Sequence, residues 1–335
     1  MHKFYNVIFF LTLMLGTMMA ISATSWFTSW IGLEMNLLSL MPIMKSTKNK
    51  YATESMMKYF MTQALASIII LMMSILILNN KSLISNLDTL NSSILSSALF
   101  MKMGAAPLHF WLPEVISGLS WPISFLILTW QKIAPMIMLL YTHPTAILTS
   151  TTIILSSIIG GVGGLNQICL RKILAYSSIN HIAWMLSALM ISSTTWMIYF
   201  SVYFIINLSL IIQLNSNNIF FISQLDKNLS KNKMEKLLFT MNFFSLGGLP
   251  PFLGFLPKWL TIYHLISHSM YIMTTILILT TLLSLFMYTR ITFSSTILVT
   301  KESNMKKNNF FLFPFYMFSS MSIMGLMIIL STSIV

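Results

Sequence analysis

The sequence predicts an all-α polytopic membrane protein with about 11 transmembrane helices, two of which are broken. Of its 335 residues, 56% are apolar and only 8% are charged, whereas a soluble domain carries roughly 25% charged residues. Runs of about 20 apolar residues, each long enough to cross a bilayer as a helix, follow one another along the chain. The hydrophilic segments between them are short, and no soluble domain fits there: 45–54, 79–88, 224–236 and 300–309.

The first candidate span, 4–23, follows the basic residues His2 and Lys3 and resembles a secretory signal. Its apolar stretch is about 20 residues long, against roughly 7–15 in a signal peptide, so we interpret it as a retained helix. The other ten spans that we expect are 26–44, 56–78, 92–112, 119–141, 145–165, 170–191, 194–214, 238–266, 269–291 and 311–332.

The basic residues indicate the topology. A net charge of +12 often indicates nucleic-acid binding, but most of these residues lie in loops between spans. With eleven spans, 15 basic residues fall on one side and Lys81 alone on the other; if the ninth span did not cross, the ratio would be 11 against 5. The positive-inside rule therefore favours eleven crossings, with the N-terminus on the cytoplasmic or matrix side. The 15 residues are Lys3, Lys45, Lys48, Lys50, Lys58, Arg171, Lys172, Lys227, Lys231, Lys233, Lys236, Arg290, Lys301, Lys306 and Lys307.

Glycines and prolines interrupt the fourth and ninth spans. The span 92–112 holds Gly104 and Pro107, and a denser group interrupts 238–266. A proline removes one helical hydrogen bond. In hydrocarbon, the freed carbonyls are tolerated only where the broken helix is buried in protein or lines a wet cavity. The second group comprises Gly247, Gly248, Pro250, Pro251, Gly254 and Pro257.

The two breaks lie five helices apart, so the two halves would have opposite orientations in the membrane. This spacing predicts inverted five-helix repeats, 1–141 and 142–293, followed by a loop and a C-terminal helix in 294–335. Inverted repeats with broken helices near the midplane are typical of secondary transporters.

Four charged residues lie inside the predicted spans: Glu34, Lys102, Lys132 and Lys258. A charge at mid-helix costs roughly 2.5–3.5 kcal/mol, so such residues are candidates for proton or cation translocation. Glu34 and Lys102 form a candidate switch, because the lysine would hold its proton near the carboxylate and release it on separation. Lys132 and Lys258 are candidates to continue a lateral relay. The alternative is that some of these side chains extend to the membrane interface.

His109 and His181 are candidate relay intermediates because histidine titrates near neutral pH, although either residue could be structural or interfacial. A single cysteine, Cys169, excludes an internal disulfide and a cysteine-built metal or iron–sulfur site. We predict no metal site. The GGVGG stretch at 160–164 lacks the setting of a phosphate loop and indicates close helix packing or a flexible helix end.

Four stretches resemble the antiporter-like subunits of respiratory complex I: FMKMGAAPLHFWLPEV, LTWQKIAP, LRKILAYSSINHIAWM and SLGGLPPFLGFLPKW. The resemblance covers nearly the whole chain. It implies that Glu34 and Lys102 form the pair of the channel, that Lys132 is the connecting lysine, and that Lys258 belongs to the second broken helix. Some relatives have Asp where this chain has Glu114, which keeps the charge.

The resemblance implies a proton-translocating core subunit that couples NADH:ubiquinone electron transfer to pumping. It places the chain in the mitochondrial inner membrane, with the N-terminus in the matrix and the C-terminus in the intermembrane space. No cofactor is expected in this chain, since NADH, FMN, iron–sulfur clusters and ubiquinone would bind other subunits. The expected partners are other membrane-arm subunits, notably subunits 4 and 4L, accessory subunits and lipid, and no nucleic acid. A stand-alone cation/proton antiporter and a structural subunit without its own proton path remain alternatives.

Overall fold

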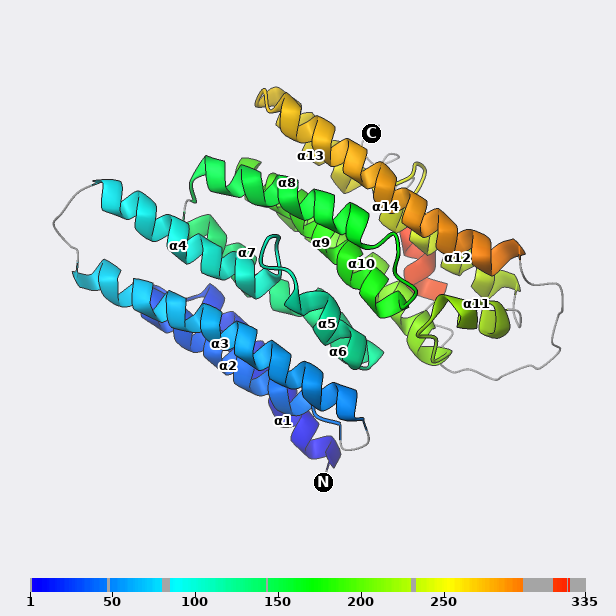
Figure 1. Cartoon of the computed structure of the whole chain (residues 1–335), viewed down its shortest axis with the longest axis horizontal. Helices are drawn as coiled ribbons and strands as arrows, with labels where there is room; N and C mark the ends of the chain where they lie inside the picture. Colours follow the sequence, from blue (N-terminus) through cyan, green and yellow to red (C-terminus); the bar gives the residue numbers. More distant parts are fainter. Residues whose placement is uncertain are drawn as a thin grey trace. The chain divides into compact units, whose positions relative to one another are not determined.

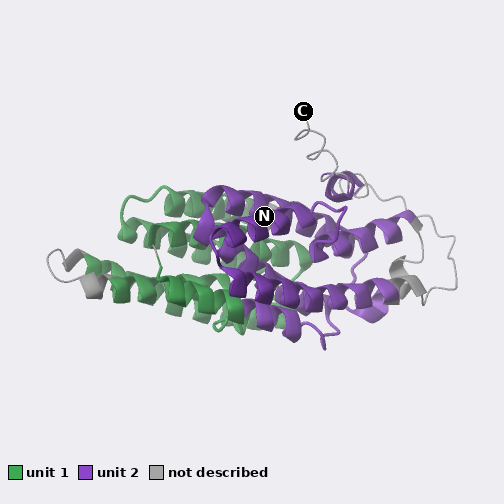
Figure 2. Ribbon diagram, turned by 90° about the horizontal axis from the view of Figure 1, so that it is seen from above, with its two compact units in different colours: residues 1–155 green, residues 156–335 purple. Residues whose placement is uncertain are grey.

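The computed structural model describes residues 2–46, 49–79, 85–142, 144–229, 233–297, 316–323 and 325. Within these ranges the regular secondary structure is helical, apart from one isolated antiparallel bridge between Cys169 and Phe221 (Figure 1). It divides into two compact units, residues 1–155 and 156–335 (Figure 2).

Unit 1 is a bundle in which the helices form a closed ring. α1 packs on α2, α2 on α3 and α3 on α4; α4 packs on α7, and α7 returns to contact α1. α5 also packs against α3 (Figure 1). The helices are α1 (His2–Ile21), α2 (Trp26–Met44), α3 (Lys50–Asn79), α4 (Ser85–Met103), α5 (Trp111–Gly118), α6 (Trp121–Leu128) and α7 (Trp130–Thr142).

In unit 2, the central helix is α9, which contacts α10, α13 and α14. In the apolar window of α9, 83% of the residues are buried. This agrees with its sequence, because a helix that is buried on all sides has apolar residues all around it. α8 crosses the division between the units. The helices are α8 (Ala146–Gly163), α9 (Leu170–Ile191), α10 (Ser193–Ser216), α11 (Ile222–Leu229), α12 (Lys233–Gly247), α13 (Phe255–Ser267) and α14 (Tyr271–Ile297).

The GGVGG stretch packs closely on a neighbouring helix. A Cβ atom added to Gly160 would lie 2.5 Å from the backbone nitrogen of Asn180 on α9. The prediction of close helix packing is therefore confirmed at Gly160.

The predicted spans agree with the helices of the described residues. α2 and α9 have the predicted bounds, and both interrupted spans leave the helical conformation. Within the part of the chain that the structure describes, six helical segments are long and apolar enough to cross a membrane: Lys50–Ile77, Trp121–Thr142, Ala146–Gly163, Leu170–Ile191, Ser193–Ser216 and Tyr271–Phe293. The total of eleven crossings stays a prediction.

Three of the hydrophilic segments between the predicted spans contain helical residues. α3 begins at Lys50, within the predicted loop 45–54. There Glu54 and Lys58 form an i,i+4 ion pair with 2.9 Å between Nζ and Oε1, which favours helix. α4 begins inside 79–88, while α11 and α12 occupy much of 224–236. The predicted span 119–141 agrees with the apolar segment Trp121–Thr142, in which α6 and α7 follow each other with an interruption at Thr129. The loop 300–309 lies outside the described residues.

Candidate functional site

The first helix break begins where α4 ends at a glycine. The Ala105 N–H donates to the Phe100 carbonyl over 3.0 Å, and the Gly104 N–H donates to the Met101 carbonyl over 3.2 Å. These two bonds form a Schellman motif, which requires a left-handed residue. Gly104 supplies it, with a φ of +77°.

The second break has the same pattern at the end of α12. The Leu249 N–H donates to the Phe244 carbonyl over 3.2 Å, and the Gly248 N–H donates to the Ser245 carbonyl over 3.0 Å. Gly248 has a φ of +78°. Both helices therefore stop by the same local mechanism, and each leaves further carbonyls that need donors in a membrane.

At the first break, neutral side chains supply these donors. Trp111 Nε1 donates to the Met101 carbonyl over 3.0 Å, and Gln63 Nε2 donates to the Lys102 carbonyl over 3.3 Å. The Lys102 side chain, only 6% exposed, makes no hydrogen bond to any residue that the structure describes. Its ammonium group is therefore not needed to hold the end of α4.

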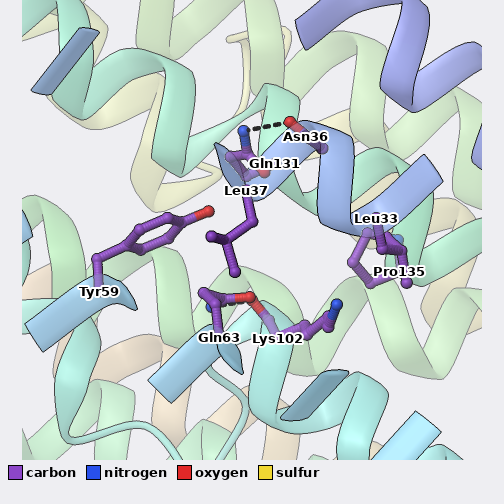
Figure 3. Close-up of a pocket in the computed structure, with 8 residues that line it drawn as sticks. All are labelled: Leu33, Asn36, Leu37, Tyr59, Gln63, Lys102, Gln131 and Pro135. Carbon is purple, nitrogen blue, oxygen red and sulfur yellow. Dashed lines mark hydrogen bonds between the residues drawn. The ribbon is translucent and has the colours of Figure 1, made fainter. Parts of the chain in front are cut away.

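Lys102 lines a small cavity within unit 1 that has room for about one water molecule (Figure 3). Asn36, Tyr59, Gln63 and Gln131 contribute polar groups to the wall. The Gln131 side-chain N–H donates to Asn36 Oδ1 over 2.8 Å and links α7 to α2. In Figure 3, Leu37 lies between this amide pair and the end of the cavity that holds Lys102 and Gln63.

Glu34 lies on α2 and is partly exposed. Its charge acts electrostatically on Lys102. No ion pair or hydrogen bond joins these two residues, both of which belong to the described part of the chain. The two members of the candidate switch are therefore not in direct contact in this structure.

Lys258 occupies the second break differently, because its own ammonium caps the broken helix. The residue lies in the first turn of α13 and is 7% exposed. Its ammonium donates to the Leu246 carbonyl over 3.3 Å and to the Gly247 carbonyl over 2.8 Å. The Trp184 ring centroid lies 6.0 Å from Nζ, within reach of a cation–π interaction. A cation at the carboxyl end of α12 also interacts favourably with the helix dipole. The remaining lysine, Lys132, lies on α7 and is 1% exposed.

We expect Gly248→Ala to disturb the second break. The alanine would lie in a left-handed conformation, which costs about 1–2 kcal/mol, and its Cβ would lie 2.7 Å from Lys258 Cδ. The assembled complex should therefore lose activity at a lower temperature. Gly247→Ala is the matched control, because its Cβ would meet its nearest neighbours at an ordinary 3.6 Å. Equal heat stability of the two variants would contradict the assignment of strain to Gly248.

The two histidines lie in different surroundings. His109 is in the first break, 4% exposed, with Nδ1 3.2 Å from the Pro107 carbonyl. His181 is on α9, with Nδ1 2.9 Å from the Tyr199 hydroxyl and its ring centroid 5.0 Å from that of Tyr203. Neither histidine lines the Lys102 cavity.

Sequence analysis missed the neutral polar residues of the cavity. Asn36 lies two residues after Glu34, and Gln131 directly precedes Lys132. A charge inside a span is the stronger signal, and it marks only Glu34, Lys102, Lys132 and Lys258. A carboxamide inside an apolar run is a weaker signal of the same kind, because it too must find hydrogen-bond partners in the membrane.

Comparison with known proteins identifies the family. The family model for the transmembrane part of NADH:quinone oxidoreductase and Mrp antiporter subunits matches residues 23–284. NADH-ubiquinone oxidoreductase chain 2 of Anopheles gambiae is 44% identical over 316 residues, which cover 92% of each chain. The chain belongs to the NADH-ubiquinone oxidoreductase chain 2 family. The chain 2 protein of Bos taurus is 36% identical over 337 residues, covering 99% of this chain and 96% of that one.

The fold agrees with that of solved relatives. A chain of respiratory complex I from Thermus thermophilus superimposes with a TM-score of 0.85 at 21% identity, covering 96% of this chain and 78% of that chain. A chain of the Mrp complex from Dietzia has a TM-score of 0.76 at 16% identity, covering 89% of this chain and 61% of that chain. The family model and the curated relatives confirm the resemblance to antiporter-like subunits, and the solved structures show that the chain shares their fold.

Proposed function

We propose that proton translocation by this membrane subunit of respiratory complex I runs through Glu34, Lys102, Lys132 and Lys258. One observation carries the proposal. Each broken helix is associated with a lysine that is at least 93% buried, Lys102 at the first break and Lys258 at the second. Burying a lysine in a membrane is costly, and a helix break is where polar backbone and water can support it.

The two lysines have complementary roles in this proposal. Lys102 is free of protein hydrogen bonds among the described residues and responds to the charge of Glu34. Lys258 is bound to helix carbonyls, and Lys132 acts as the connecting lysine of the proposed path. His109 and His181 act as intermediates, each with one ring nitrogen already close to an oxygen atom. No cofactor takes part in this chain.

We also propose that residues 1–141 and 142–293 are inverted repeats. A constant separation of 144 residues supports this proposal, because identical or chemically similar residues recur at this separation in the two halves. The related pairs are Gly16 and Gly160, Asn36 and Asn180, Tyr59 and Tyr203, Gln63 and Asn207, Gly104 and Gly248, Pro107 and Pro251, and Pro113 and Pro257. Residues 294–335 follow the second repeat.

The proposed location is the mitochondrial inner membrane, with the N-terminus in the matrix and the C-terminus in the intermembrane space. The excess of basic residues on one side supports this orientation. Subunits 4 and 4L of the membrane arm are the proposed neighbours.

Native electrophoresis of mildly solubilised inner membranes tests this assignment. We expect the chain in the band that stains for NADH dehydrogenase activity, together with subunits 4 and 4L by mass spectrometry. In intact mitoplasts, protease should cut the C-terminus and spare the N-terminus.

A chain that migrates alone would contradict the assembly. Na⁺- or K⁺-driven pH changes in proteoliposomes containing only this chain would then indicate a stand-alone antiporter. Cleavage of the N-terminus in intact mitoplasts would reverse the proposed orientation.

A further inference from the structure

The Lys102 cavity contains polar groups that its protein neighbours leave unused. A lysine ammonium has three N–H donors, and that of Lys102 makes no hydrogen bond within the described ranges. The Tyr59 hydroxyl, on a side chain that is 2% exposed, has no hydrogen-bond partner there either. Gln63 uses its side-chain nitrogen on the Lys102 carbonyl, and its oxygen remains available as an acceptor.

Such groups are costly to bury without partners. The cavity has room for about one water molecule, and a buried water typically makes 2–4 hydrogen bonds. We propose that Gln63 and Tyr59 are positioning residues that hold a water molecule against the Lys102 ammonium. This inference rests on the proposed function of Lys102.

The geometry of α3 places both residues on one side of the cavity. Tyr59 and Gln63 are four residues apart, which puts them on the same face of the helix. Figure 3 shows Gln63 beside Lys102, with the Tyr59 ring at the same cavity. The water would accept one hydrogen bond from the ammonium and donate to the oxygen of Gln63 or Tyr59, which reduces the number of unpaired polar groups in the site.

Both residues are themselves held in place by the break. Gln63 donates to the backbone carbonyl of Lys102, which ties the last turn of α4 to α3. The Tyr59 ring packs edge-on against Trp111 at 5.8 Å, while Trp111 caps the Met101 carbonyl. The acceptor groups are therefore fixed relative to the helix that carries the lysine.

The second half offers a contrast. Tyr203 and Asn207 precede Gly248 by 45 and 41 residues, as Tyr59 and Gln63 precede Gly104. There, however, Asn207 donates to the Tyr203 carbonyl, and the Lys258 ammonium binds helix carbonyls directly. A lysine that is already bound to protein acceptors has less need of a water, so we assign the water site to the first half.

Tyr59→Phe and Gln63→Met test the inference in the assembled complex. Each change preserves the approximate shape and removes an acceptor. Losing one hydrogen bond to a charged group changes the corresponding equilibrium constant by roughly tenfold or more. The rate of proton translocation through this subunit should therefore fall by about that factor. NADH oxidation by an artificial electron acceptor should stay unchanged. A high-resolution map of the unmodified complex should contain a water between Lys102 and Gln63, and the Gln63→Met map should lack it.

Gln213→Met is the matched control. Gln213 is also a buried glutamine whose side-chain N–H donates to a backbone carbonyl, that of Glu235, over 2.8 Å. The inference is overturned if Gln63→Met affects translocation no more than Gln213→Met does, if Tyr59→Phe translocates normally, or if the cavity is dry. If Lys102→Met also translocates normally, the proposed function itself fails; if only Lys102→Met is impaired, the function stands and the water site does not.

Discussion

The Lys102→Met variant should assemble into an intact complex and translocate protons poorly through this subunit. Removing a positioned proton-transfer group typically costs on the order of 10²–10⁴ in rate, and methionine cannot carry a proton. Stability should be unchanged or higher, because the carbonyls at the end of α4 are capped by Trp111 and Gln63 and not by the lysine. The measurement is the number of protons translocated per NADH oxidised in proteoliposomes, together with the heat stability of the complex.

Lys102→Arg is the informative companion variant. Arginine keeps the positive charge but does not release its proton in proteins. It should therefore fail to translocate as Lys102→Met does, although the charge is preserved. Normal pumping per electron in Lys102→Met would falsify the role of this residue, and loss of assembly would indicate that Lys102 is structural.

Lys258→Met should impair both translocation and stability. The Leu246 and Gly247 carbonyls would lose their donor in a membrane-buried site, at roughly 1–3 kcal/mol for each unsatisfied group. The expected result is a complex that is less heat-stable than Lys102→Met and that also pumps poorly. The two single variants, measured side by side by the same assays, isolate the contribution of carbonyl capping.

Lys258→Gln separates the two roles of this lysine. The amide retains N–H donors for the carbonyls but cannot carry a proton, so it should recover part of the lost heat stability without recovering translocation. A Lys258→Met complex as heat-stable as the unmodified one would show that the bonds to α12 contribute nothing measurable.

Most helices could be predicted from the sequence, because a membrane span is a long and uninterrupted run of apolar residues. The sequence also located both breaks, since Gly104 and Gly248 stand beside prolines inside apolar runs. It did not predict the division between α6 and α7 at Thr129, where no glycine marks the interruption. Nor did it predict α11, an eight-residue helix that is too short and too polar to stand out as a membrane span.

The candidate site was predictable only as far as its charges. Lys102, Lys132 and Lys258 stand out because a charge is rare in a span. The different hydrogen bonding of Lys102 and Lys258 depends on which distant residue reaches the helix end. Gln63 lies 39 residues before Lys102, and such a partner follows from tertiary packing that no local pattern encodes.

The capping of the two breaks has a mechanical consequence. A charged donor binds carbonyls about twice as strongly as a neutral one, so loss of a proton from Lys258 would weaken the hydrogen bonds that join α12 to α13. At Lys102 the same event leaves the backbone clamps of Trp111 and Gln63 untouched. In the proposed proton path, the first half would exchange protons at constant shape, and the second would convert protonation into movement of a helix end.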